Sequence, residues 1–324
     1  MQAFKISDLP LSAVSAADNE FQISGVGDDS SALAASMAAS GLCIPILVTR
    51  QGSAEAYTVV SGFKRLEAAR TLGWETISCR VAHDTIAKSC LAKMAVAENA
   101  FQRQLGPGEL VRAAGLLSKY MDINELAGIS QAVFNTGLNS GYLKSLLSIH
   151  DLPAHAVHLL DTGQLSIKAA KLITALENDA VHALLDIFSA LNLSASKQTE
   201  IITWTKEIAA RDGVTVKEVC MGADIRQVLP SADNLKDRAQ AGNRLRGILF
   251  SKRYPHLDAA KKAAADSVRT LKLPKGIRLT LPESFESSVY SATISFTSVQ
   301  EFAKRAEALG QLSGHEGLKS LLDR

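Results

Sequence analysis

One short stretch of the sequence, residues 57–73 (YTVVSGFKRLEAARTLG), constrains the fold more than any other. Tyr57 to Ser61 is rich in the β-branched and aromatic residues that favour strands, and it ends at Gly62. Apolar residues then recur at the spacing of one helix face until Gly73, a typical helix stop. The stretch therefore predicts a strand, a tight glycine turn and a short helix that begins at the turn.

The first turn of this helix carries two cations, Lys64 and Arg65. A helix N-terminus leaves N–H groups unpaired and carries a partial positive charge, so cations are unfavourable there unless an anion is bound. The placement therefore indicates a phosphate ligand. The alternative is an ordinary connection from strand to helix, with both cations pointing into water.

Three segments of the chain resemble the ParB amino-terminal domain family. Residues 57–73 resemble its Gly-x-Arg-Arg phosphate-binding box. Residues 98–109 (ENAFQRQLGPGE) resemble its Glu-Asn-x-x-Arg motif with the trailing Leu-x-Pro-x-Glu, and residues 41–48 (GLCIPILV) resemble the strand before the first box. The order and spacing are those of the family, which implies the ParB/sulfiredoxin-like fold, a small mixed sheet with helices.

The resemblance also implies ligands and partners. It implies a switch that binds CTP and Mg²⁺, DNA as the main partner, a partition ATPase as a further partner, and a homodimer. Carried over residue by residue, the nucleotide site consists of Gly62, Phe63, Lys64, Arg65, Glu98, Asn99 and Arg103.

The second motif has a chemical interpretation of its own. A helix over residues 85–98 would deliver Glu98 and Asn99 at its end. They offer oxygen ligands of the kind that hold Mg²⁺ together with phosphates, while Arg103 could neutralise phosphate oxygens. The alternative is a carboxylate and an amide that only cap the helix end or bond a loop.

Some positions depart from the family pattern. Phe63 replaces a glutamate, Glu67 replaces a basic residue, and the expected arginine of the second motif falls on Gln102, one place before Arg103. Fewer positive groups face the phosphates, so we expect nucleotide affinity or hydrolysis to be weakened or lost, with a slow CTPase as the upper limit. Sulfiredoxin activity is excluded, because sulfiredoxin has its reactive cysteine where Phe63 stands, and Phe is not a nucleophile.

Residues 107–229 have helical periodicity throughout. Helices over 123–134 and 141–150 around a glycine-bearing turn predict a helix-turn-helix, and this part also resembles the helical DNA-binding portion of ParB-family proteins. Because the second helix has a single cation, a helix-turn-helix that serves only as packing is the alternative. The residues expected to face DNA are Ser140, Tyr142, Lys144 and Ser145.

The last part of the chain, residues 235–324, predicts a small basic α+β domain after a linker at 230–234. Between Lys236 and Arg278 there are twelve Lys or Arg residues against three Asp, a charge of +9, which leaves −7 on the rest of the chain. We expect this segment to contact DNA phosphates with little sequence selectivity, unless its cations only solvate a helix face. The predicted contacts are Lys252, Arg253, Lys261 and Lys262. Two antiparallel strands and a helix capped by Ser298 and Glu301 should follow.

Composition sets further limits. A chain of 324 residues with 47% hydrophobic and 21% charged residues has room for two or three domains with ample core. It has no run of eighteen apolar residues and no signal-peptide pattern, so we expect a cytoplasmic protein without membrane contact. Its four cysteines are widely spaced, so we expect them to be buried and reduced, with no disulfide and no structural metal.

These inferences together predict a mainly helical α+β chain of three parts: a nucleotide-binding domain at 1–106, a helical domain at 107–229 and a basic domain at 235–324. The expected function is that of a ParB-like DNA-binding protein in partition or regulation. One alternative is a nucleotide hydrolase or nuclease on the same fold, although the chain lacks the clustered carboxylates of two-metal cleavage. Another is an adaptor that has lost nucleotide binding.

Overall fold

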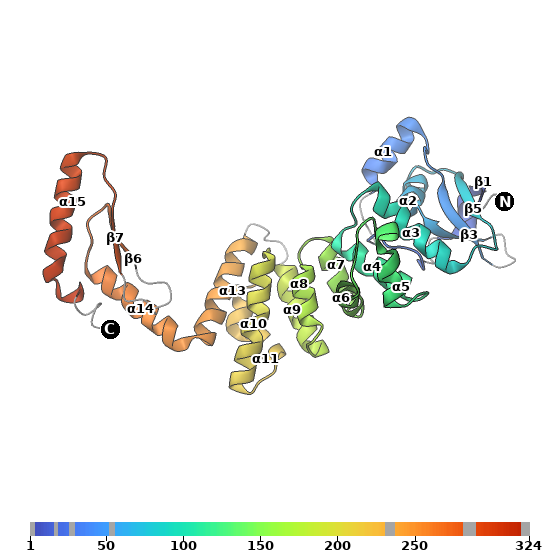
Figure 1. Ribbon diagram of the computed structural model, residues 1–324. Coiled ribbons are helices and arrows are strands. Elements are labelled where there is room, and N and C mark those ends of the chain that lie inside the picture. The colour runs from blue at the N-terminus through green and yellow to red at the C-terminus, as the bar shows by residue number, and fades with distance from the viewer. Residues whose placement is uncertain are drawn as a thin grey trace.

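The structure is a computed structural model that describes residues 4–15, 19–25, 30–51, 56–230, 237–280 and 290–318. Within these residues the fold is mainly helical α+β, with a five-stranded mixed sheet first and a two-stranded sheet last. The elements follow one another along an extended molecule, with the larger sheet near one end and the last helix at the other (Figure 1). None of the described helices is long and apolar enough to cross a membrane.

The amino-terminal sheet has five strands in the order β1 (Phe4–Pro10), β5 (Thr76–Ala82), β3 (Ile46–Arg50), β4 (Tyr57–Ser61) and β2 (Val14–Ser15). β3 pairs antiparallel with β4 and parallel with β5, β1 is antiparallel to β5, and β2 is parallel to β4. A short 3-10 helix, η1 (Leu11–Ala13), links β1 to β2. All five residues of β4 are buried, which explains why its sequence is a continuous β-rich run.

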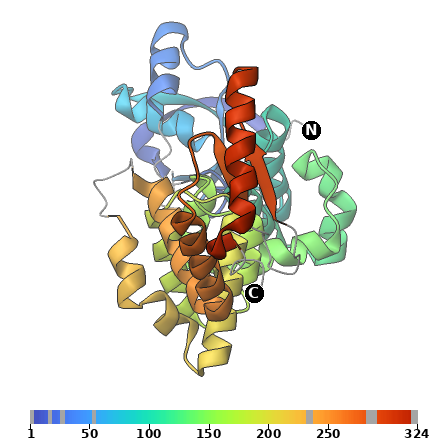
Figure 2. The same ribbon diagram turned by 90° about the vertical axis from the view of Figure 1, so that its left-hand side faces the viewer.

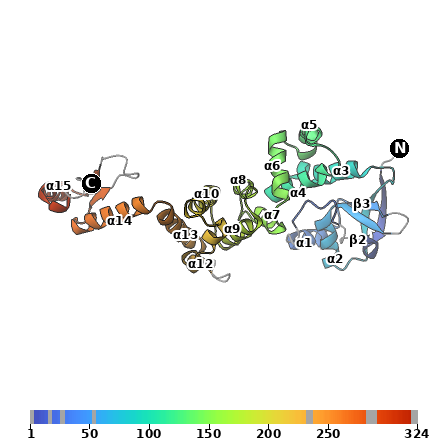
Figure 3. The same ribbon diagram turned by 90° about the horizontal axis from the view of Figure 1, so that it is seen from below.

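Helices cover both faces of this sheet. Alternate residues of a strand point to opposite faces, and here Ile46 and Val59 join one hydrophobic cluster while Leu47 and Val60 join the other. The first cluster contains residues of α1 (Ser31–Ser40) and α2 (Phe63–Thr71), and the second contains the buried face of α3 (Lys88–Gln102). Seen from below, α2 and α3 lie on opposite sides of the strands (Figure 3).

The helical middle of the chain begins directly after α3. It consists of α4 (Pro107–Ser118), α5 (Ile123–Phe134), α6 (Ser140–His150), α7 (Ala154–Asp161), α8 (Ile167–Ile173), α9 (Asn178–Ala190), α10 (Ala195–Asp212), α11 (Val216–Cys220) and α12 (Ala223–Val228). The predicted pair of helices around a turn is present: Asp122 caps α5, Asn135 ends it in the left-handed region, and the side chain of Asn139 caps α6.

The hydrophobic core does not break where α3 ends. One cluster runs from Leu47 and Val60 of the sheet through α3 and α4 and on to Leu249 of α13 (Arg238–Arg253). The proposed boundary at residue 106 therefore falls in the short connection between α3 and α4, and the packing continues across it.

The carboxy-terminal part contains α14 (Pro255–Thr270), β6 (Ile277–Thr280), β7 (Ser291–Ile294), α15 (Val299–Gln311) and the 3-10 helix η3 (Leu312–Gly314). The two strands are antiparallel, as predicted. In the view along the long axis, α15 stands in front of the rest of the molecule (Figure 2). The sequence also predicts a turn at 51–54 and a strand connection at 282–288, and these segments, like the linker at 230–234, lie wholly or largely outside the described residues.

Three details of this part and of the cysteines differ from the sequence-based predictions. The alternation of apolar and polar residues at 290–296 predicts a half-buried strand, but Ala292 of β7 is exposed and Phe296, just beyond the strand, is 53% exposed. Ser298 caps α15, but the carboxylate of Glu301 accepts its bonds from Thr297. Cys79 and Cys220 are buried, whereas Cys43 and Cys90 are exposed because they lie in a loop and at the start of α3.

The turn at Gly62 should tolerate no side chain. Its φ is 102°, and a Cβ placed there would lie 2.7 Å from Cγ2 of Ile46. We expect Gly62→Ala to lower the free energy of unfolding by about 2–4 kcal/mol, from backbone strain and overpacking. Gly247→Ala, at an exposed site of α13 with open space around it, should raise it by up to about 1 kcal/mol. Urea unfolding followed by circular dichroism measures both, and equal stability of the two variants would contradict this account.

Candidate functional site

All seven residues predicted for the nucleotide site line one cavity of about 360 Å³. The cavity is enclosed by α1, the segment before β3, the start of α2 and the end of α3. Its volume lies in the range of small-molecule sites. The shared lining consists of Gly62, Phe63, Lys64, Arg65, Glu98, Asn99 and Arg103.

The rest of the lining was not predicted. An apolar wall comes from residues such as Phe21, Leu33 and Met37, and hydroxyl groups come from Ser36 and Ser40 of α1. No motif marks these residues, because they come from segments that are far apart in the sequence and meet only when the sheet forms. Gln102, which takes the place of the expected arginine, also lines the cavity.

The start of α2 presents backbone groups to the cavity. Gly62 is the N-cap and has no side chain, and the first intrahelical bond runs from Leu66 N to Gly62 O at 3.0 Å. The N–H groups of Phe63, Lys64 and Arg65 precede that bond and belong to residues that line the cavity. This end of the helix therefore suits an anion, as the sequence indicated.

Glu98 lies between two arginines. Its Oε1 accepts a bond from Arg65 at 2.7 Å and its Oε2 accepts one from Arg80 of β5 at 2.9 Å, while its side chain is only 15% exposed. Arg65 also donates to the carbonyls of Ile44 and Pro45. Arg80 was missed from the sequence, because a lone arginine in a strand carries no signal of its distant partner. The cluster joins β5, α2 and α3.

This arrangement does not suit Glu98 as a ligand of Mg²⁺. Both of its carboxylate oxygens already bind guanidinium groups, whose charges oppose a further cation. Asn99 donates its side-chain N–H to the carbonyl of Ala95. Both residues also lie within α3, which continues to Gln102, instead of ending it as predicted. In the described parts of the chain, no group of three or more His, Cys, Asp or Glu side chains is placed to hold a metal ion.

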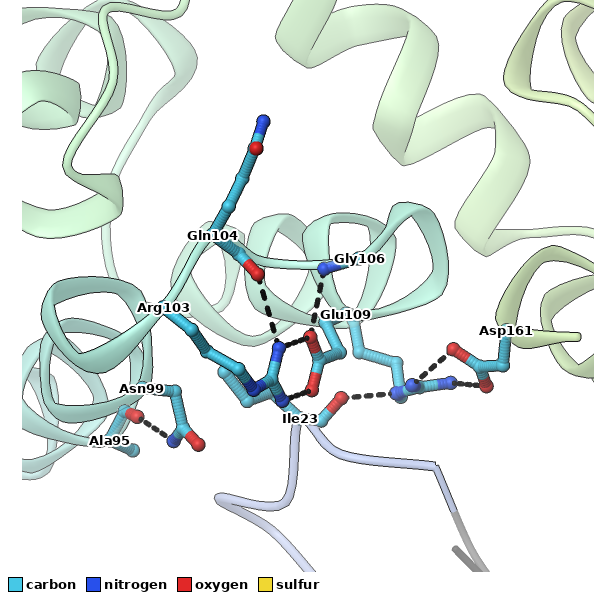
Figure 4. A network of polar contacts seen from close by, with 9 residues as sticks. Ile23, Ala95, Asn99, Arg103, Gln104, Gly106, Glu109 and Asp161 are labelled. Carbon is cyan, nitrogen blue, oxygen red and sulfur yellow. Dashed lines mark hydrogen bonds and ion pairs between the residues drawn. The ribbon is translucent and has the colours of Figure 1, made fainter. Parts of the chain in front are cut away.

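Arg103 is bound by a carboxylate from the next helix. Its two terminal nitrogens donate to Glu109 at 2.7 and 2.5 Å, and one of them also donates to the carbonyl of Gln104 at 3.1 Å (Figure 4). Glu109 additionally accepts a bond from the N–H of Gly106 and so caps α4. Burial alone would raise the pKa of Glu109, but the bonds from Arg103 and Gly106 outweigh it and hold this pKa below its usual value.

A second ion pair ties the cavity to the helical middle. Arg112 of α4 binds both carboxylate oxygens of Asp161 at the end of α7, each at 2.8 Å. It also donates to the backbone carbonyl of Ile23, which lies in the loop that lines the cavity (Figure 4).

The residues predicted to face DNA from the helix-turn-helix are only partly available. Lys144 is exposed, Ser140 is half-buried and donates to Asn124 at 3.3 Å, and Tyr142 packs against the core, where burial raises its pKa. Ser145 is 8% exposed and donates to the carbonyl of Gly141, so its assignment to the DNA face is wrong. Sequence analysis missed the exposed Lys168 and Lys171 of α8, a helix that contacts α6.

Most of the predicted phosphate contacts in the basic segment have acidic partners. Lys252 binds Asp224 of α12 at 3.0 Å, Arg253 binds Glu207 of α10 at 2.6 Å, and Lys262 binds Asp258 of its own helix at 2.7 Å. Lys261 lies 4.6 Å from the centroid of the Phe250 ring. Acids outside the segment therefore neutralise part of its charge of +9.

Comparison with known proteins identifies the amino-terminal part of the chain. Residues 2–100 match the profile of the ParB N-terminal domain. The chain carries a ParB N-terminal domain. This confirms the resemblance drawn from the two motifs. No curated protein matches the chain.

Solved ParB structures are also similar to this chain. The C-terminally truncated chromosome-partitioning protein ParB from Caulobacter crescentus complexed with CTP-gamma-S is 20% identical, covering 57% of this chain and 99% of that chain, with a TM-score of 0.28. The same protein complexed to the centromeric parS site is 18% identical, covering 61% and 98%, with a TM-score of 0.35. A Pnob8-like ParB-N domain is 12% identical, covering 77% and 97%, with a TM-score of 0.40. The predicted homodimer and partition ATPase stay predictions.

If Glu98 stabilises the fold, replacing it should lower the free energy of unfolding even when no ligand is bound. Glu98→Ala leaves Arg80 and Arg65 without their shared carboxylate, and we expect the free energy of unfolding to fall by about 1–3 kcal/mol. Glu67→Ala, on the exposed side of α2, should change it by no more than about 0.5 kcal/mol. Urea unfolding in metal-free buffer with a chelator measures both. A residue that only binds a metal would show no difference from the control.

Proposed function

We propose that this chain is a ParB-like DNA-binding protein, acting in partition or regulation, whose ParB N-terminal domain binds a nucleotide as a switch. The observation that supports it is that residues from both motifs, within 62–65 and 98–103, line the same cavity. CTP is the nucleotide that the resemblance of the motifs implies. The proposal divides the chain into a nucleotide-binding part at 1–106, a helical part at 107–229 and a basic part at 235–324.

The two kinds of lining suit the two ends of a nucleotide. The start of α2, with its N–H groups and Lys64, takes the phosphates, because a helix N-terminus and a cation both favour negative charge. The apolar wall that includes Phe21, Leu33 and Met37 takes the base. A metal ion would have to arrive with the phosphates, because Glu98 is already held by two arginines.

Calorimetry with CTP, ATP, GTP and UTP, each with and without Mg²⁺, tests the nucleotide. We expect heat for CTP, and we expect Lys64→Ala to weaken binding roughly ten- to a hundred-fold by removing one charge-assisted contact. Lys5→Ala, an exposed lysine on the outer strand β1, is the matched control and should leave the affinity unchanged. No heat with any of the four nucleotides would refute the proposal.

DNA contact is proposed for α6 and its neighbour α8. Lys144, Lys168 and Lys171 are exposed there, whereas Lys252 and Arg253 of the basic segment must give up ion pairs before they can contact phosphate. This differs from the sequence-based expectation, which relied on charge alone and could not foresee the acidic partners.

A gel-shift series across salt concentrations compares the two surfaces. Each lost phosphate contact should lower the slope of log affinity against log salt by about 0.9. We expect the variant Lys144→Ala/Lys171→Ala to bind DNA more weakly and with a smaller dependence on salt. The variant Lys252→Ala/Arg253→Ala should keep most of its affinity and most of its salt dependence. The reverse result would restore the basic segment as the main DNA surface.

A second function, an adaptor that has lost nucleotide binding, is favoured by one observation. Arg65 and Arg103, two of the cations expected to meet phosphate, already bind Glu98 and Glu109. An adaptor would show DNA binding in the gel shift and no heat in the calorimetry.

A further inference from the structure

Glu109 binds the guanidinium group of Arg103, which a bound phosphate would otherwise contact. Arg103 lines the cavity, yet both of its terminal nitrogens donate to the carboxylate of Glu109. A carboxylate held by two parallel N–H bonds presents to arginine the same geometry as a phosphate. We propose that Glu109 is a specificity-determining residue that competes with the ligand for Arg103, so that the cavity selects nucleoside di- and triphosphates over monophosphates. The inference rests on the proposed function.

The competition is possible because the two partners differ in exposure. The side chain of Arg103 is about half exposed and borders the cavity, so a ligand can reach it. Glu109 is only 6% exposed, and it stays in place because it also accepts the N–H of Gly106 at the start of α4 (Figure 4). The arginine can therefore turn toward a ligand while the carboxylate remains where it is.

The free-energy cost of moving Arg103 from Glu109 to the ligand sets the selectivity for di- and triphosphates over monophosphates. When Arg103 leaves, Glu109 remains as a buried carboxylate with the Gly106 N–H and the nearby charge of Arg112. Leaving a buried charge with fewer partners is unfavourable, so the ligand must offset this cost with a second phosphate group that makes contacts of its own. A di- or triphosphate that also contacts the start of α2 can do so, whereas a monophosphate offers a single group for both places.

A double-mutant cycle in the full chain separates competition from simple contact. The variants are Glu109→Gln, Arg103→Ala and the two combined, titrated by calorimetry with CTP and with CMP. Gln keeps an oxygen for the Gly106 N–H but has no charge to hold Arg103. We expect Glu109→Gln to bind CTP on the order of ten-fold more tightly and to narrow the preference for CTP over CMP. Arg103→Ala alone should change CTP affinity little, and it should abolish the gain in the double variant.

Glu125→Gln is the matched control, because Glu125 forms the equivalent capping box at the start of α5, away from the cavity. It should leave both affinities unchanged. Glu109→Asp is a second variant that keeps the charge but is too short for the paired bonds, and it should also tighten CTP binding. Circular dichroism confirms folding of each.

The outcomes distinguish this inference from the proposed function. If the unaltered chain binds CTP and neither Glu109→Gln nor Glu109→Asp binds it more tightly, Glu109 only caps α4 and the inference fails while the nucleotide site stands. If no variant binds CTP, the nucleotide site itself is wrong, and the inference falls with it. A gain in Glu109→Gln that persists after Arg103→Ala would show that Arg103 is not the contested group.

Discussion

The close approach of Gly62 to Ile46 is the constraint on which the site depends. Because the turn has a positive φ and no room for a Cβ, the chain can leave β4 and enter α2 within one residue. That abrupt entry brings the start of α2 to the same cavity as the end of α3, which packs on the opposite face of the sheet. Any residue with a Cβ would be strained at this φ and would meet the side chain of Ile46.

Every arginine around this cavity is paired with a carboxylate. Arg65 and Arg80 share Glu98, Arg103 binds Glu109, and Arg112 binds Asp161. Partly buried charges must be paired for the fold to be stable without a ligand, so the same pairs that support the domain also oppose ligand binding. Phe63 and Gln102 stand where the family pattern has charged residues, so this chain has fewer charges around the cavity. The arginine charges that remain are paired with carboxylates.

Local features of the fold could be predicted from the sequence, whereas long-range pairings could not. Asp122 and Ser298 cap the helices expected of them, because a cap depends on residues within one turn. Arg80 could not be linked to Glu98, since sheet and helix meet only in three dimensions. Ser145 was misplaced, because its side chain is buried in the packed helices and its hydroxyl donates to the carbonyl of Gly141, neither of which the sequence reveals.

The same distinction between local features and long-range pairings explains why the partners of the basic segment could not be predicted. Its charge could be counted from the sequence, but acids that neutralise part of it lie on α10 and α12, which pack against α13. The candidate nucleotide cavity differs from the basic segment in its surroundings, because residues next to it belong to one continuous core that extends from the sheet into α4 and α6. A change at Arg103 therefore acts on the first turn of α4 directly, through Glu109, and α4 in turn packs on α6. Physical contact between the candidate nucleotide site and the helix-turn-helix thus runs through α4, whose first turn Glu109 caps, and also directly from α3 to α5.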